Sequence, residues 1–116
     1  MSEPGRIGTT ARMAETQIGR AEVRVARTSA DKLTGPRLGQ HKSVALPSGW
    51  NLNILHRYVN NGINEYYVNA SKDGVGTTNY YSQYTADGRY PGAYSTVRGS
   101  RADAFDDIKR WAKGLR

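Results

Sequence analysis

The chain has 116 residues, of which 37% are apolar, and its 17 Lys and Arg against 10 Asp and Glu give a formal net charge of +7 at pH 7. A chain of this length forms one small domain with a limited core, and its positive charge favours an anionic partner such as nucleic acid. Because the chain contains no cysteine, disulfides and thiolate metal sites are excluded, and no segment has the apolar length of a membrane span.

The first 42 residues differ from the rest because they contain no aromatic residue and carry eight Lys and Arg. We expect residues 1–42 to form a basic, largely irregular N-terminal arm, partly disordered, with a short helix over 11–18 or an edge strand over 20–27. An ordinary disordered tail is the alternative. The N-terminus has no apolar run typical of a secretory signal, so we expect a cytoplasmic protein of a bacterium or of a phage-infected host.

Three turn signals divide the next part of the chain into segments rich in β-forming residues: Asn61-Gly62, Asp73-Gly74 and Asp87-Gly88. Each dipeptide tolerates the positive φ angles of a tight turn between two antiparallel strands. The pattern predicts a four-stranded antiparallel meander over about residues 50–98, with strands near 52–60, 63–71, 77–86 and 89–98. Pro91 has no N–H for a sheet hydrogen bond, so we expect the last strand to be bulged or to lie at an edge.

A C-terminal helix is predicted over about residues 100–114. Ser100 is suited to cap its N-terminus, with Asp103 three residues later as in a capping box. One apolar stripe follows at spacings of 3, 3 and 4, formed by Phe105, Ile108, Trp111 and Leu115. The predicted fold class is therefore α+β, with residues 43–116 forming a small domain in which the meander is packed by this helix.

Two-residue turns set the strand register, and the register decides which side chains share a face of the sheet. In the expected register Arg57 pairs with Tyr66, Tyr66 with Tyr81, and Tyr81 with Tyr94. The other face has no Lys or Arg, so we expect it to pack on the helix; it collects Leu52, Ile54, His56, Tyr58, Ile63, Tyr67, Tyr80, Tyr84, Ala93 and Val97. The face that carries the tyrosine row is then expected to be exposed.

We predict that this exposed face binds nucleic acid, with single strands favoured. The candidate site residues are Arg57, Tyr66, Tyr81, Tyr94 and Arg98. Tyrosine rings can stack on bases while guanidinium groups attract phosphates, and the basic arm would add affinity independent of sequence. Three alternatives stay open. The tyrosines could serve only to stabilise the sheet. The two faces could be inverted, as the apolar Leu55 and Val68 on the expected exposed face suggest, or a bulge near Pro91 could move Tyr94 to the other face.

Two other functions are compatible with the sequence. A phage or mobile element could encode such a protein as an inhibitor that binds a host enzyme, because protein interfaces also favour Tyr and Arg. A metal-independent ribonuclease is the other option, with His56 and Glu65 as acid and base and Arg57 beside them. No catalytic, metal-binding or cofactor-binding motif is present, so the sequence predicts no metal, cofactor or membrane partner.

The predicted order of elements resembles that of single-stranded-DNA-binding transcriptional coactivators. Its ending, strands followed by a helix, also resembles the small DNA-binding domains of plant transcription factors and phage integrases, in which a three-stranded sheet enters the major groove. None of the sequence motifs of these groups is present, so the resemblance is one of architecture only.

Overall fold

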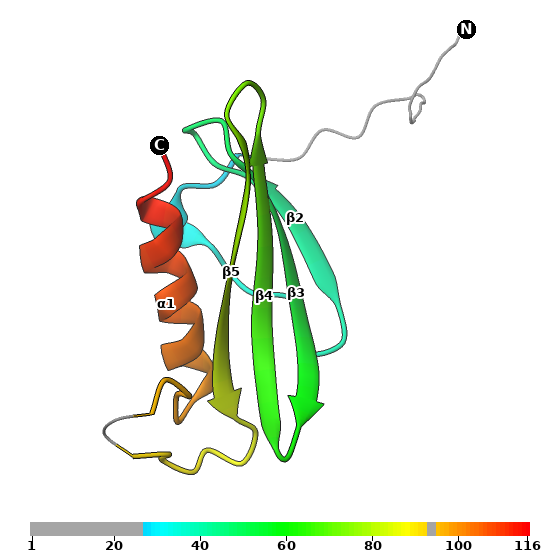
Figure 1. The fold of residues 1–116 in the computed structure, drawn as a ribbon, viewed down its shortest axis with the longest axis vertical. Helices are drawn as coiled ribbons and strands as arrows, with labels where there is room; N and C mark the ends of the chain where they lie inside the picture. The colour runs from blue at the N-terminus through cyan, green and yellow to red at the C-terminus, as the bar shows by residue number, and fades with distance from the viewer. Residues whose placement is uncertain (1–26, 93–94) are drawn as a thin grey trace, which may run out of the picture.

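A computed structural model describes residues 27–92 and 95–116 of the chain, which form a four-stranded sheet with one helix against it (Figure 1). In chain order the elements are the 3-10 helix η1 (Ala30–Lys32), strands β2 (His41–Ala45), β3 (Asn51–Asn60), β4 (Ile63–Lys72) and β5 (Gly76–Thr85), and helix α1 (Arg101–Lys113). The strand order is β2-β3-β4-β5, and all neighbours are antiparallel. The predicted α+β fold class is confirmed, whereas the helix expected over 11–18 and most of the edge strand expected over 20–27 lie outside the described residues.

The fourth strand of the sheet is β2, and the prediction of a strand over 89–98 is wrong for the described part of that segment. There, outside the named strands, Arg98 makes a single parallel bridge with Tyr84. The Asp87-Gly88 turn does not open a hairpin, and in it the Asp87 carboxylate accepts a hydrogen bond from the Arg89 N–H at 3.0 Å. The chain then passes to α1 instead of returning along β5. The fourth strand lies at the opposite edge of the sheet, where β2 pairs with β3.

Both remaining hairpins differ from the expected register by one residue. In the first, Asn60 pairs with Ile63 as expected, but a bulge then makes Tyr58 pair with Asn64. In the second, Lys72 pairs with Gly76, so the loop has three residues instead of two. Each shift moves side chains to the opposite face. Strand β4 is therefore inverted relative to the prediction, while the two shifts cancel at β5.

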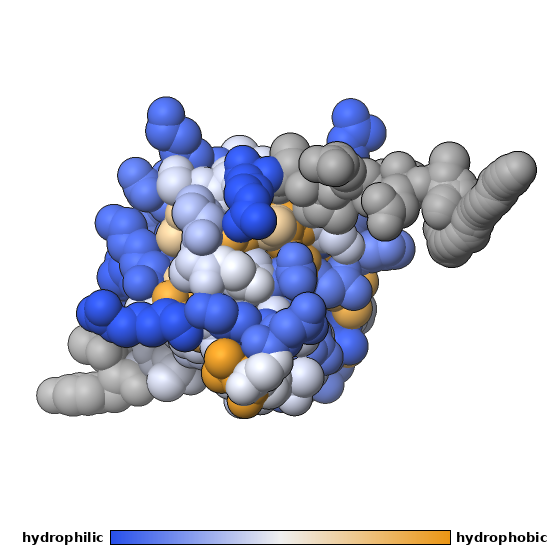
Figure 2. Space-filling view, turned by 90° about the horizontal axis from the view of Figure 1, so that it is seen from above, coloured by the Kyte–Doolittle hydropathy of each residue, from blue (hydrophilic) through white to orange (hydrophobic). Residues whose placement is uncertain are grey.

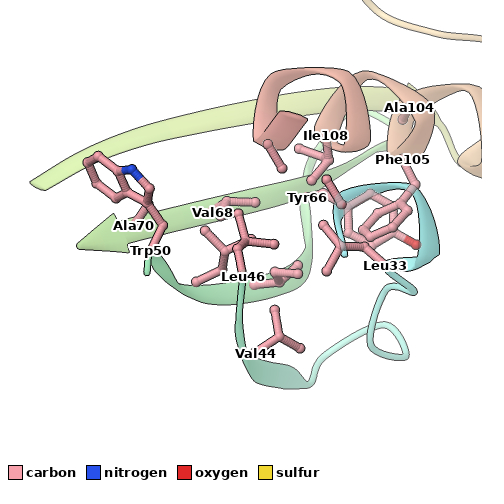
Figure 3. Close-up of a cluster of buried hydrophobic side chains, with 14 of the residues drawn as sticks. Leu33, Val44, Leu46, Trp50, Tyr66, Val68, Ala70, Ala104, Phe105 and Ile108 are labelled. Atoms are coloured by element: carbon pink, nitrogen blue, oxygen red, sulfur yellow. The ribbon is translucent and has the colours of Figure 1, made fainter. Parts of the chain in front are cut away.

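The hydrophobic core lies between one face of the sheet and α1 (Figure 3). Strands β3 and β4 contribute fully buried aliphatic side chains, including Ile54 and Val68, which pair directly. The ring of Phe105 on α1 meets the Tyr66 ring edge-on at a centroid distance of 4.9 Å. Leu33, just after η1, is buried beside them, so part of the segment predicted as an arm supplies core side chains.

Helix α1 begins where the sequence predicts. The Ser100 hydroxyl accepts a hydrogen bond from the Asp103 N–H at 3.1 Å, which caps the helix. Along the predicted stripe Ile108 is buried, and Trp111 stacks on Tyr80 with ring centroids 5.3 Å apart. The helix has 13 residues, and none of the helices in the described ranges is long and apolar enough to cross a membrane.

The outer surface is mainly hydrophilic. Figure 2, which looks down on one end of the molecule, shows a few hydrophobic residues between many hydrophilic ones. The large apolar side chains that are exposed in the described ranges are spread over strands β3 and β5 and over loops: Leu38, Tyr58, Val59, Val75, Tyr81 and Tyr90. Three of these six are tyrosines, whose hydroxyl keeps one end of an exposed ring hydrated.

The new register predicts very different costs for removing two tyrosines. Tyr66 is 3% exposed and Tyr81 is 59% exposed. We expect Tyr66→Ala to lower the free energy of unfolding by about 3 kcal/mol or more, because it leaves a cavity beneath α1. We expect Tyr81→Ala to lower it by about 1 kcal/mol or less. Urea unfolding followed by tryptophan fluorescence measures both, and equal losses would contradict the assignment of faces.

Candidate nucleic-acid interface

The sheet face opposite α1 is polar, and no element in residues 27–92 or 95–116 packs over it as α1 packs over the other face. We call it the open face and define it by the outward residues of the strands: Ser43, Asn53, Leu55, Arg57, Glu65, Tyr67, Asn69, Asn79, Tyr81 and Gln83. Its asparagines and Tyr81 are exposed, and Tyr67 is half-buried. A sheet that is covered on one side only leaves such a surface free for a partner.

Three rows of side chains cross the open face, and two of them are uncharged. One row joins Leu55, Tyr67 and Tyr81, which are direct cross-strand partners. The neighbouring row consists of asparagines, with Asn69 paired to both Asn53 and Asn79. Directly paired residues have Cβ atoms only about 4.5–5.5 Å apart. The register therefore places two phenol rings alongside three amide groups.

A third row holds the only charged groups of the open face. Arg57 binds the Glu65 carboxylate through Nε at 2.9 Å and Nη2 at 2.8 Å, and the Gln83 amide donates to the same carboxylate at 2.9 Å. The Glu65 side chain is only 7% exposed, whereas that of Arg57 is 50% exposed. The Arg57 guanidinium carbon lies 5.3 Å from the centre of the Tyr67 ring, within the range of a cation–π contact. Arg57 is thus held in place at the edge of the tyrosine pair.

The structure places two of the five predicted site residues, Arg57 and Tyr81, on the open face. The prediction of an exposed Tyr66 is wrong: its ring stacks on His56 at a centroid distance of 4.1 Å, and burial raises the pKa of its hydroxyl to about 12. Arg98 lies beside the edge strand β5, and Tyr94 falls outside the described residues.

Tyr67 and Asn69 belong to the open face but were not predicted there. The shift at the first hairpin is the reason, because it turns odd-numbered β4 residues outward. A signal was present in the sequence: apart from Ile63 at its start, the aliphatic residues of β4 are Val68 and Ala70, which alternate with polar residues. Matching them to Leu52 and Ile54 would have identified the register.

Arg98 has a structural partner on α1. Its Nε donates to the Asp107 carboxylate at 2.8 Å, and Arg110 and the Ser82 hydroxyl bind the same carboxylate. Burial opposes ionisation of Asp107, but the hydrogen bonds and charges of the two arginines outweigh it and hold the Asp107 pKa below its usual value. This cluster joins the segment before α1 to the helix itself.

His56 is buried in a hydrogen-bonded network on the helix side of the sheet. Its Nδ1 lies 2.9 Å from the Pro36 carbonyl oxygen, and its Nε2 lies 2.7 Å from the Tyr84 hydroxyl. A carbonyl only accepts, so Nδ1 carries the proton and the Tyr84 hydroxyl donates to Nε2. Glu65 lies on the opposite face, so this arrangement does not bring His56 and Glu65 together as an acid–base pair.

Within the described ranges no three His, Asp or Glu side chains gather in a way that would hold a metal ion. Comparison with protein-family models, curated protein sequences and solved structures finds no match to this chain. The candidate interface therefore rests on its own geometry.

The buried His56 predicts a pH dependence of stability. Burial lowers the pKa of His56 below 6.5, the Pro36 hydrogen bond opposes this, and the charge of Arg101 adds to the lowering. Between the lowered pKa and 6.5 the unfolded chain binds more protons than the folded one. The contribution of neutral His56 to the free energy of unfolding is therefore fully present above pH 6.5. It falls as the pH drops below 6.5, by at most about 1.4 kcal/mol per pH unit for one proton.

Chemical denaturation between pH 7.5 and 5 measures this dependence. The exposed His41 provides a matched control, so His41→Gln should keep the decline. His56→Gln should remove it while lowering stability at neutral pH, because its contact with Tyr84 is altered. A decline that persists in His56→Gln would assign the titration to another group.

Proposed function

We propose that this protein binds nucleic acid through the open face, with single strands preferred. One observation carries the proposal: Tyr67 and Tyr81 lie side by side on a sheet face over which none of the described elements packs, with the Arg57 guanidinium 5.3 Å from the Tyr67 ring centre. Bases stack on aromatic rings and on guanidinium planes, and this stacking needs the bases to be unpaired. An exposed strand surface with two adjacent rings accommodates neighbouring bases.

The asparagine row supports the same function. Each amide offers donors and an acceptor, as base edges do. Asn53, Asn69 and Asn79 are exposed next to the tyrosines, so a stacked base can form hydrogen bonds with them. The net charge of +7 adds attraction to phosphates at longer range, and the basic residues of the N-terminal arm contribute to that charge.

A protein partner is the second candidate, and the balance of charge on the open face favours it. Arg57 and Glu65 neutralise each other there, so the face carries little net charge for a phosphate backbone. Tyrosine and arginine are also enriched in protein interfaces. On this view the protein binds a host enzyme as an inhibitor through the same residues.

Tyr81→Ala tests the proposal. Losing one stacked base costs about 1–3 kcal/mol, so we expect affinity for a 12-nucleotide single strand to fall by about 5- to 150-fold. Tyr90→Ala is the matched control, because Tyr90 is 73% exposed and does not belong to the open face. The affinity of the Tyr90→Ala variant for the single strand should equal that of the wild type. Fluorescence anisotropy with single- and double-stranded DNA and RNA at two salt concentrations makes the measurement.

The two candidates give different outcomes. Wild-type protein that binds none of the four nucleic acids at low salt would remove the proposed function. A host protein that is retained by nuclease-treated wild type and lost by Tyr81→Ala would then support the second candidate. Equal affinity of Tyr81→Ala and wild type for single strands would exclude the open face as the nucleic-acid surface.

A further inference from the structure

A cleft lies on the helix side of the sheet, away from the open face. It runs between residues 33–37 and the first turns of α1, and its volume is about 540 Å³. This volume is within the range of small-molecule sites. The two walls come from segments more than 60 residues apart in the sequence, which only the folded chain brings together.

Positive charge predominates in this cleft. Its lining includes Arg37, Arg101 and Lys109, with Asp106 as the single carboxylate. Other arginines in the described ranges, such as Arg57, Arg98 and Arg110, each bind a carboxylate. None of the ion pairs among the described residues includes a cleft cation. Among the residues that the structure describes, the cleft is therefore lined by three cations and one carboxylate.

The floor of the cleft is apolar and closely packed. It is formed by Leu33 and by the rings of Tyr66 and Phe105. Gly35 lies directly against the Tyr66 ring, since a Cβ at this position would be only 2.7 Å from Tyr66 Cε1. The Tyr66 hydroxyl is neutral near pH 7, and burial raises its pKa further, to about 12, so the floor adds no negative charge. Low-dielectric walls strengthen the attraction of the cations for an anion.

We propose that this cleft binds a phosphate group, with Arg37, Arg101 and Lys109 as its ligands. Guanidinium groups match phosphate oxygens two at a time, and a lysine ammonium supplies a further point charge. A free nucleotide and the backbone of a nucleic-acid strand both present this chemistry, and the site is independent of the open face because it lies on the other side of the sheet.

Amide chemical shifts of ¹⁵N-labelled full-length protein test the site. Titration with inorganic phosphate and with AMP should shift signals in residues 34–37 and 101–109, while adenosine at the same concentration should leave them unchanged. A tetraglutamate peptide serves as a non-phosphate anion. Shifts of equal size with tetraglutamate, or no shifts in these two segments with either phosphate probe, would overturn the proposal.

A pair of double variants separates a built site from general surface charge. Arg37→Gln/Arg101→Gln removes two cleft cations at exposed positions, and we expect AMP to bind about tenfold more weakly. Lys113→Gln/Arg116→Gln removes the same charge from exposed positions that do not line the cleft. Its AMP affinity should change less than about twofold at low salt. An equal loss of AMP affinity in both double variants would show that AMP responds to net charge alone, and would overturn the phosphate site.

The Tyr81→Ala variant separates this proposal from the proposed function. Cleft shifts with AMP should persist in Tyr81→Ala, whatever happens to single-strand binding. If AMP and a 12-nucleotide strand both shift the amide signals of the cleft residues, and the strand binds more tightly, the backbone of a strand is the source of the phosphate. If AMP alone shifts the cleft, the source is a free nucleotide. Both results support the phosphate site.

Discussion

The rest of the structure depends on the aliphatic side chains of β3 and β4 sharing one face. Ile54 pairs with Val68 and Leu52 with Ala70, and all four are buried beneath α1 or beside it. Burial of each Val, Leu or Ile side chain stabilises the fold by about 1.5–3 kcal/mol, and the smaller Ala70 contributes less. A pairing shifted by one residue would expose one strand's set to water. The bulge at the end of the first hairpin is the local adjustment that reconciles a tight Asn61-Gly62 turn with this pairing.

This same constraint determines the composition of the open face. Once Val68 and Ala70 point inward, Tyr67 and Asn69 must point outward, next to Tyr81 and Asn79. The buried face also accepts polar groups where they find partners. His56 bonds to the Pro36 carbonyl and to Tyr84, which ties the segment after η1 to the centre of the sheet. Because that segment is held there, it can form one wall of the basic cleft.

The distribution of charge differs between the two sides of the molecule. On the open face the Arg57–Glu65 pair balances itself, and recognition there would rely on rings and amides. On the helix side Arg37, Arg101 and Lys109 face a cleft with a single carboxylate. Rings and amides suit the bases of a nucleic acid, whereas cations suit its phosphates. The two surfaces therefore carry complementary chemistry on opposite sides of one sheet.

The sequence by itself determined the elements whose signals are local. The Ser100 cap, the apolar stripe of α1 and the Asn61-Gly62 turn depend on neighbours in the chain, and each is present. A turn is also present at Asp73-Gly74, although its loop is one residue longer than expected. Of the candidate site, Arg57 and Tyr81 were placed on the correct face, but Tyr81 only because the two register shifts cancel at β5. Only the tertiary structure determines the one-residue shifts of strand register and the burial of Tyr66. It also determines that β2, and not residues 89–98, is the fourth strand, and that the cleft exists. These depend on which apolar groups, distant in the chain, share a core, and local propensity carries no information about that choice.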